Sequence, residues 1–397
     1  MKILHVISSL APRYGGPPKA CWEMARAVAQ LGHEVSIYTT NQDGPGELAV
    51  PLGQPVWQEG VEILYFPIQP PRFWATSVPL ALGLRHKIPA SDLVHIHSLY
   101  FFHSLVAGHY CRQNAIPYLV RPHGTLDPFI YRRHRWRKRL VELLFEHRNI
   151  RRATALHFTT AEEQVLAAPY TFDTPGVVVP LGIGADEFAL MPEPGIFRRR
   201  HPEIGDKRII LFFGRVNFKK GLDILAKAFG AAARQCQDVH LVIAGPDNEG
   251  WGARVRTWLG KEGVLGRTTF TGMLLGPDKL AVLRDASMFV LPSYTENFGL
   301  AVIEAMAAGL PIIISDKVNI WREVESAGAG KVVPCEAGKF TEAILDLLDK
   351  PELAWQMGQK GQALVRDEFH WPDIAVRLQE TYAILIDRHR LSMKIKR

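Results

Sequence analysis

Short runs of β-branched and other apolar residues alternate with helix-like stretches along most of the chain, and this alternation constrains the fold more than any other feature. Parallel strands need crossover connections, which are usually helices, so the pattern predicts parallel sheets covered by helices on both faces. The expected strands lie near residues 2–7, 34–39, 61–66, 92–97, 117–121, 154–158 and 177–180 in the first half, and near 208–213, 238–244, 268–271, 288–292, 311–314 and 331–333 in the second.

Two such sets in a chain of 397 residues predict an α/β protein with two doubly wound, Rossmann-like domains. The boundary is expected within residues 181–205, which contain the linker-like sequences M-P-E-P-G and R-R-R-H-P. We place the N-terminal domain at residues 1–185 and the C-terminal domain at 186–371. Ligands of doubly wound sheets bind beyond the carboxyl ends of the strands, so two facing sheets predict a site in an interdomain cleft.

The composition, with 47% apolar and 22% charged residues, is that of an ordinary globular protein. Four cysteines lie far apart with no C-x-x-C pair, which argues against a zinc knot or a disulfide framework and fits a reducing cytosol. The first ten residues are expected to form a strand rather than a signal peptide, and no uncharged apolar run is long enough to span a membrane. We expect a cytoplasmic protein, soluble or attached to a membrane surface.

Residues 131–152 carry nine Arg or Lys residues against two Glu residues, a local excess of +7 that equals the net charge of the whole chain. Apolar residues are interleaved at helical spacing. Three interpretations are open: a basic amphipathic helix on an anionic membrane, a helix whose charged face is solvated above an ordinary core stripe, or a nucleic-acid site, for which no motif is present. The basic residues in question include Arg132, Arg133, Arg135, Arg137, Lys138 and Arg139.

The stretch 293–311 places Glu296 just before a predicted helix and Glu304 inside it. A carboxylate on such an apolar helix costs several kcal/mol if it is buried unpaired, so Glu304 needs a partner. The helix start at Gly299 and Leu300 offers free N–H groups to a phosphate. Together these groups suggest a ligand that is part sugar and part phosphate. The alternative is a buried glutamate satisfied by neighbouring backbone.

The segment G-R-V-N-F-K-K-G, residues 214–221, follows a predicted strand directly. Arg215 can grip phosphate oxygens with its planar guanidinium, and Lys220 adds a second positive charge. Two cations at the carboxyl end of a strand favour an anion site over surface decoration. Lys219 is predicted to face solvent.

Two loops of the first half also follow predicted strands. The segment R-P-H-G-T-L-D-P places His123 where an active-site loop is expected, and this histidine could bind a sugar hydroxyl, act as acid or base, or be purely structural. The glycine pair Gly15-Gly16 either lets the backbone approach an anion or forms a tight turn without a ligand.

Several motifs are absent from the sequence. No G-x-G-x-x-G supports a nicotinamide or flavin cofactor, and no Asp-x-Asp pair is present to hold a metal-bound diphosphate. We therefore expect no cofactor and no metal. Arg215, Lys220 and helix N-termini would have to neutralise a diphosphate instead.

Taken together, these motifs resemble glycosyltransferase family 4, whose members are retaining, sugar-nucleotide-dependent enzymes of the two-domain GT-B fold. The likeness covers nearly the whole chain. Its most specific part is E-x-F-G-L-x-x-x-E-A-x-A-x-G-x-P at 296–311, and the family's P-N-G appears here as Pro180-Leu181-Gly182. The closing F-H-W at 369–371 implies that a last helix, 372–397, packs back on the N-terminal, acceptor-binding domain. The C-terminal domain would then bind the nucleotide-sugar.

The resemblance also implies roles for single residues. Arg215 and Lys220 would bind the donor diphosphate with the N–H groups of Gly299 and Leu300, and Gly16 would let the first loop close over the ligands. Glu304 would accept hydrogen bonds from the ribose. The catalytic residues would be His123, near the reacting carbon, and Glu296, on the transferred sugar.

The activity implied is transfer of a hexose from a UDP- or GDP-sugar to a hydroxyl of a glycan or polyprenyl-linked acceptor, as in cell-surface polysaccharide biosynthesis. Because such acceptors are often lipid-linked, the basic segment is expected to hold the protein at the inner face of the plasma membrane, and nucleic acid is not an expected partner. Two alternatives are a sugar-nucleotide 2-epimerase of the same architecture and a non-catalytic membrane-associated protein that kept the fold.

Overall fold

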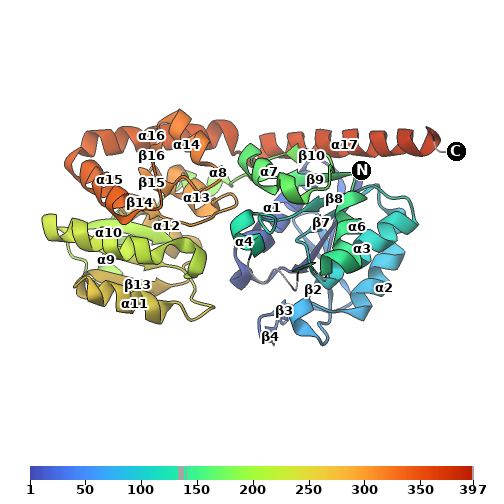
Figure 1. Cartoon of the computed structure of the whole chain (residues 1–397), viewed down its shortest axis with the longest axis horizontal. Coiled ribbons are helices and arrows are strands. Elements are labelled where there is room, and N and C mark those ends of the chain that lie inside the picture. Colours follow the sequence, from blue (N-terminus) through green and yellow to red (C-terminus); the bar gives the residue numbers. More distant parts are fainter. Residues whose placement is uncertain (133–137, 140, 396–397) are drawn as a thin grey trace. The chain divides into compact units, whose positions relative to one another are not determined.

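The computed structural model describes residues 1–132, 138–139 and 141–395. The chain folds into two compact units, one formed by Met1–Gly182 with Trp371–Arg397 and the other by Ile183–His370 (Figure 1). Each unit is built around one largely or wholly parallel sheet. The α/β class predicted from the alternation of strands and helices is therefore confirmed.

The sheet of the first unit has eight strands in the order β10-β9-β8-β7-β1-β2-β6-β5. All neighbours pair in parallel except β5, which runs antiparallel to β6 at the edge and was not predicted. The strands are β1 (Lys2–Ser9), β2 (Glu34–Thr40), β5 (Pro55–Gln58), β6 (Val61–Phe66), β7 (Leu93–His97), β8 (Tyr118–Arg121), β9 (Ala155–Phe158) and β10 (Gly176–Val178), with a small separate hairpin of β3 (Gln42–Asp43) and β4 (Gly46–Glu47).

Helices cover both faces of this sheet. Leu4 and Val6 of β1 belong to a buried apolar cluster that includes residues of α2 and α3, whereas α1 packs against α17. Since successive strand residues point to opposite faces, His5 lies on the face away from that cluster. The helices are α1 (Gly16–Gln30), α2 (Val78–Lys87), α3 (Phe102–Gln113), α4 (Pro128–Arg132), α6 (His147–Arg151), α7 (Ala161–Ala167) and α17 (Trp371–Ile395), with the short turns η1 (Pro12–Tyr14), η2 (Arg72–Trp74), η3 (Ile88–Ala90), the π-helical η4 (Glu142–Glu146) and η5 (Ala168–Tyr170).

The sheet of the second unit is wholly parallel, with six strands in the order β13-β12-β11-β14-β15-β16. Its central strands are buried along their length, as expected of strands covered on both faces. The strands are β11 (Arg208–Phe213), β12 (Val239–Ala244), β13 (Thr268–Gly272), β14 (Met288–Leu291), β15 (Ile312–Ser315) and β16 (Gly330–Val333). The helices are α8 (Ala185–Ala189), α9 (Ile196–Arg200), α10 (Leu222–Gln235), α11 (Gly252–Lys261), α12 (Gly276–Asp285), α13 (Leu300–Ala307), α14 (Trp321–Ala327), α15 (Ala337–Asp349) and α16 (Pro351–Glu368), with turns η6 (Phe218–Lys220) and η7 (Leu265–Arg267).

The order of strands places the ends of β11 and β14 side by side, because these two strands are neighbours in the sheet. The loop after β11 leads to α10 and the loop after β14 leads to α13, so both loops meet at the carboxyl edge of the sheet. Within the part of the chain that the structure describes, no helix combines the length and the apolar run needed to cross a bilayer.

Candidate active site

The second unit brings together a carboxylate and three cations at this carboxyl edge. Lys220 donates to Oε2 of Glu296 in a partly buried ion pair, and the ammonium of Lys219 lies 3.8 Å from Oε1 of the same carboxylate. Arg215 completes the cluster and adds its positive field. The prediction that Lys219 faces solvent is wrong, because its side chain is only 19% exposed and pairs with Glu296.

The backbone holds this cluster firmly. Gly221 ends η6 with φ +62°, and an added Cβ would lie 1.9 Å from the carbonyl oxygen of Pro292, so only glycine lets the Lys220 turn approach the loop after β14 so closely. Tyr294 N–H donates to Lys219 O at 2.7 Å. On the other side, Glu296 N–H donates to Lys317 O at 2.9 Å, which fixes the Glu296 backbone to the loop after β15.

Electrostatics keep Glu296 ionised. Burial by itself opposes ionisation, but the fields of Lys219, Lys220 and Arg215 and the hydrogen bond from Lys220 outweigh it and lower the pKa of Glu296 to about 2. Three cations around one carboxylate leave a local excess of two positive charges. Within the described residues, Arg215 forms no salt bridge or hydrogen bond, so its guanidinium is available to a ligand.

Glu304 has the partner that its place on an apolar helix requires. Its Oε1 lies 3.2 Å from the ammonium of Lys279, which also lies 2.6 Å from Glu187. Both Glu304 and Lys279 are buried, at 5% and 6% exposure. Glu304 therefore has a charged partner, and Lys279 was not predicted because it lies 25 residues away in the sequence.

Two helix N-termini can supply N–H groups. Gly299 caps α13 with φ +83°, and the amides of Leu300 and Ala301 at its first turn lie outside the helical hydrogen-bond ladder. In the first unit Gly15 adopts φ +73° and Gly16 begins α1. Because Pro17 and Pro18 follow, only Gly16 and the fourth residue can donate from that first turn, so α1 is the weaker anion site.

His123 lies in the first unit, just after β8, and its φ of +52° is unusual for a residue with a side chain. The next residue, Gly124, donates its N–H to Oε1 of buried Glu163 at 3.2 Å. His123 Nε2 contacts His97 Nδ1 at 3.1 Å. Neither Glu163 nor His97 was predicted to belong to this site.

In the described part of the basic segment, Leu143 and Leu144 do not lie on a core stripe, which contradicts the interpretation of a solvated charged face above an ordinary core. Glu142 and Glu146 are buried, at 4% and 0% exposure, whereas Leu143 and Leu144 are 78% and 70% exposed. The glutamates point inward because they accept hydrogen bonds: Glu142 from the hydroxyls of Tyr100 and Tyr131, each at 2.8 Å, and Glu146 from Ser104, Asn149 and the Tyr100 amide. Leu143 and Leu144 are consequently presented to the outside, whereas Ile150 of the same segment is buried.

Of the basic residues predicted to form a surface here, Arg132 and Arg139 are exposed. Lys138 instead lies inward, with its ammonium 2.8 Å from Ile130 O and over the rings of Tyr100 and Tyr131. Arg133, Arg135 and Arg137 lie outside the described residues.

Comparison with family models identifies both units. Residues 195–364 match the model of glycosyl transferases group 1, and residues 15–182 match the glycosyl transferase 4-like domain. The chain therefore belongs to the group 1 glycosyltransferases of family 4, which have the GT-B fold and are retaining enzymes that transfer a hexose from a nucleotide-sugar. The predicted family, enzyme class and fold are confirmed.

Relatives span nearly the whole chain. An uncharacterized glycosyltransferase of Methanocaldococcus jannaschii is 27% identical, with 98% of this chain and 99% of the relative aligned. A GDP-mannose:cellobiosyl-diphosphopolyprenol α-mannosyltransferase of Xanthomonas campestris is 25% identical, with 84% of this chain and 83% of the relative aligned. The crystal structure of Anabaena HepE in complex with UDP-glucose has a TM-score of 0.76 and 18% identity, with 96% of this chain and 99% of that chain covered.

The buried pair of Glu304 and Lys279 generates a stability prediction. Lys279→Met should destabilise the second unit by about 3 kcal/mol, because it leaves a buried carboxylate without its main partner. The double variant Lys279→Met with Glu304→Gln should recover more than half of that loss. Urea denaturation followed by tryptophan fluorescence measures both. Equal destabilisation of the single and the double variant would show that the two side chains do not act as a pair.

The low pKa of Glu296 predicts that the protein loses stability as the pH falls into the acidic range. A carboxylate whose folded pKa lies near 2, below its ordinary value of 4.5, stabilises the fold fully above about pH 4.5 and loses that contribution as the pH falls towards 2. The wild-type protein should therefore lose more stability between about pH 5 and pH 3 than Glu296→Gln does. Thermal unfolding midpoints across this range test the prediction, and parallel curves for the two proteins would contradict it.

Proposed function

We propose that this glycosyltransferase moves a hexose from a UDP- or GDP-sugar to a hydroxyl of a glycan or polyprenyl-linked acceptor, in the biosynthesis of a cell-surface polysaccharide. The single observation that carries the donor part is the charge balance of the Glu296 cluster. Three cations against one ionised carboxylate leave an excess of two positive charges, which matches the two negative charges of a nucleotide diphosphate esterified to a sugar.

In this proposal the diphosphate binds Arg215, Lys220 and the amides of Gly299 and Leu300, and these groups stabilise its charge as it leaves. Glu304 would hold the ribose from its place on α13. Glu296 would accept hydrogen bonds from hydroxyls of the transferred sugar. Because its pKa is about 2, it is ionised at neutral pH and serves as an acceptor, not as a proton donor.

Retention of configuration is proposed to follow from reaction on one face of the sugar. The leaving phosphate oxygen would take the proton of the incoming acceptor hydroxyl as the new glycosidic bond forms, so that the diphosphate leaves as the old bond breaks. A covalent route needs a nucleophile at the reacting carbon. Trapping of a glycosyl adduct in Glu296→Gln would contradict the one-face route.

The proposal of a lipid-linked acceptor is supported by the relative from Xanthomonas campestris, whose name specifies a diphosphopolyprenol substrate, and by the basic segment. That segment buries two glutamates and exposes two leucines, the reverse of the arrangement that water favours. Leu143 and Leu144 flanked by arginines suit the interface of an anionic membrane, where apolar side chains enter the acyl boundary and cations meet the headgroups. We propose peripheral attachment through this surface, at the inner face of the plasma membrane.

A donor panel tests the proposed activity. UDP- or GDP-sugars should release nucleotide in the presence of a polyprenyl-linked acceptor, and EDTA should not lower the rate, because protein cations replace a divalent ion. Arg215→Met and Lys220→Met should each lower kcat/KM by about 100-fold or more. Lys207→Met, a lysine at the opposite end of β11, is the matched control and should keep the wild-type rate.

Three outcomes would contradict this account. Epimerised sugar nucleotide without an acceptor would indicate the 2-epimerase, and no release with any donor and acceptor would indicate a non-catalytic protein. A requirement for Mg²⁺ or Mn²⁺ would contradict the cation cluster as the diphosphate site.

The membrane proposal is tested by co-sedimentation with vesicles of phosphatidylglycerol and phosphatidylcholine. Burial of each leucine in the membrane should contribute about 1.5 kcal/mol to the binding free energy. The double variant Leu143→Ser with Leu144→Ser should therefore weaken vesicle binding by about 100-fold. Arg→Glu changes at 132, 133, 135 and 137 should abolish the preference for phosphatidylglycerol. The control is Leu190→Ser, which changes a leucine of the second unit that is 87% exposed. Binding that is unchanged by salt and by both sets of variants would refute attachment through this segment.

A further inference from the structure

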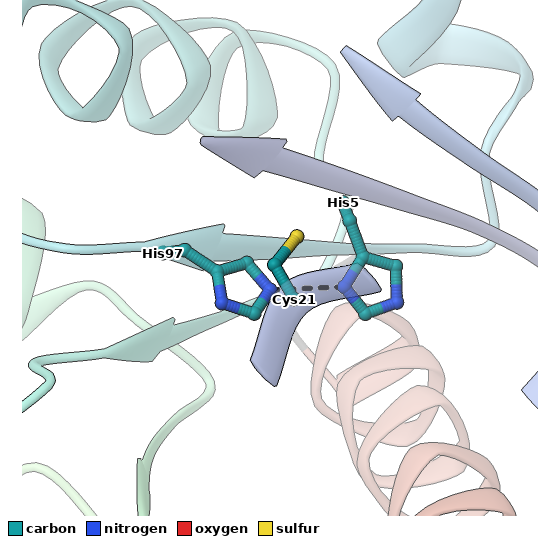
Figure 2. A group of neighbouring side chains, drawn as sticks. All are labelled: His5, Cys21 and His97. Atoms are coloured by element: carbon teal, nitrogen blue, oxygen red, sulfur yellow. Dashed lines mark hydrogen bonds between the residues drawn. The ribbon is translucent and has the colours of Figure 1, made fainter. Parts of the chain in front are cut away.

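Histidines gather on one face of the first sheet, behind His123. His5 of β1, His95 and His97 of β7 and His157 of β9 are all 0% exposed. Figure 2 shows His5 and His97 joined by a hydrogen bond, with Cys21 of α1 beside them. The proposed transfer reaction uses none of these buried rings.

The rings form two separate hydrogen-bonded rows. In the first row, His123 Nε2 lies 3.1 Å from His97 Nδ1, and His97 Nε2 lies 2.9 Å from His5 Nδ1. In the second row, the Tyr382 hydroxyl lies 2.9 Å from His95 Nδ1, His95 Nε2 lies 3.3 Å from His157 Nδ1, and His157 Nε2 lies 2.8 Å from Val179 O.

All of these imidazoles are neutral near pH 7. Burial lowers the pKa of His5 and of His157 to about 3, and it also lowers the pKa of His95, His97 and His123 well below the ordinary value. A neutral imidazole has one N–H and one lone pair, so each ring in a row must donate on one side and accept on the other. The group at the end of a row therefore decides the tautomer of every ring in it.

The second row is polarised by a backbone carbonyl. Val179 O can only accept, so His157 donates through Nε2 and accepts at Nδ1. His95 must then donate through Nε2, and the Tyr382 hydroxyl donates to His95 Nδ1. This row does not reach His123.

The first row ends at His5 Nε2, which has no hydrogen-bond partner among the described residues. Close by lies the guanidinium of Arg121, which is 1% exposed and likewise has no hydrogen-bond partner there. After burial, the charge of Arg121 is the main influence on the pKa of His5. Next to a buried cation, an unprotonated Nε2 with its lone pair is more stable than an N–H group without a partner.

We propose that Arg121 and His5 polarise the first row so that His97 donates to Nε2 of His123, which leaves the proton of His123 on Nδ1. His5 then donates from Nδ1 to His97 Nε2, and His97 donates from Nδ1 to His123 Nε2. His97 is a positioning residue that acts through His123. Its own backbone is held by His103, whose Nε2 donates to His97 O at 2.6 Å.

This inference sharpens the role of His123, and in that respect it rests on the proposed function. With Nδ1 protonated and Nε2 occupied by His97, His123 can donate a hydrogen bond to a sugar oxygen but has no free lone pair with which to accept a proton. His123 would orient the transferred sugar and would not be a general base.

The same region also has the ligand types of a transition-metal site, since the candidate ligand atoms of His5, Cys21 and His97 lie within 4.8 Å of one another. The neighbouring charge of Arg121 disfavours a cation there, and the His5–His97 hydrogen bond already occupies one ring nitrogen of each histidine. Bound metal is therefore an outcome that the test must distinguish.

The test is ¹⁵N NMR of the imidazoles in the full chain without substrate. The chain has 15 histidines, so the His123 signals are assigned by their loss in His123→Asn. We expect Nδ1 of His123 to be protonated and Nε2 to be unprotonated in the wild type. His97→Phe breaks the row at His123 and His5→Phe breaks it at its far end, and each should convert His123 to a mixture of both tautomers. His157→Gln, in the second row, should leave His123 unchanged.

Protonation of Nε2 in the wild-type protein would overturn the proposal, and so would a tautomer of His123 that is unaffected in both His97→Phe and His5→Phe. One equivalent of zinc in the purified protein, lost in His5→Phe, would assign the three ligands to a metal instead. If His97→Phe does not fold, His5→Phe still decides. Because the measurement needs no substrate, it can fail while sugar transfer stands, and the donor panel can fail while the tautomer stands.

Discussion

The interaction on which the candidate site depends is the partly buried contact of Glu296 with the lysines of the β11–α10 loop. A carboxylate with an exposure of 14% is stable in ionised form only among cations, and the cations in turn need it while no other anion is present. The glycine at 221 and the backbone bonds from Tyr294 and Glu296 bring the loops together for this contact. The residual positive charge follows from the geometry, and the proposed donor site follows from that charge.

The fold could be predicted from the sequence because strand and helix periodicity are local properties. The buried strands of the second unit read as continuous apolar runs, such as I-I-L-F-F, and they lie within a residue or two of where they were expected. The edge strand Pro55–Gln58 was not predicted, since an exposed strand with a proline at its start has no apolar run to mark it.

Long-range pairing explains what the sequence could not show of the site. Lys279 and Glu304 come from different helices, and Tyr100 and Glu142 are separated by 42 residues, so no spacing links them. The exposed leucines at 143 and 144 follow from that second pairing, because the glutamates take the inner positions. Lys219 and Lys220 both contact Glu296 because they lie in the 3-10 turn Phe218–Lys220. If the segment were extended, consecutive side chains would point to opposite sides, so the sequence alone did not predict that both would reach one carboxylate.

Part of the histidine rows is visible in the sequence. The sequence V-H-I-H of β7 places His95 and His97 two residues apart, and strand geometry puts both on one face. His5 pairs in register with His95 across β1 and β7, which brings a third ring to that face. Only the structure shows that His123 joins the row.

A crystal structure of the protein with UDP tests the central claim most directly. The account predicts that the diphosphate contacts the Arg215 guanidinium and the Lys220 ammonium, with a phosphate oxygen at the amides of Gly299 and Leu300 and no metal ion bridging the phosphates. A diphosphate bound elsewhere, or held through a divalent ion while Lys220 keeps Glu296 as its only partner, would contradict it.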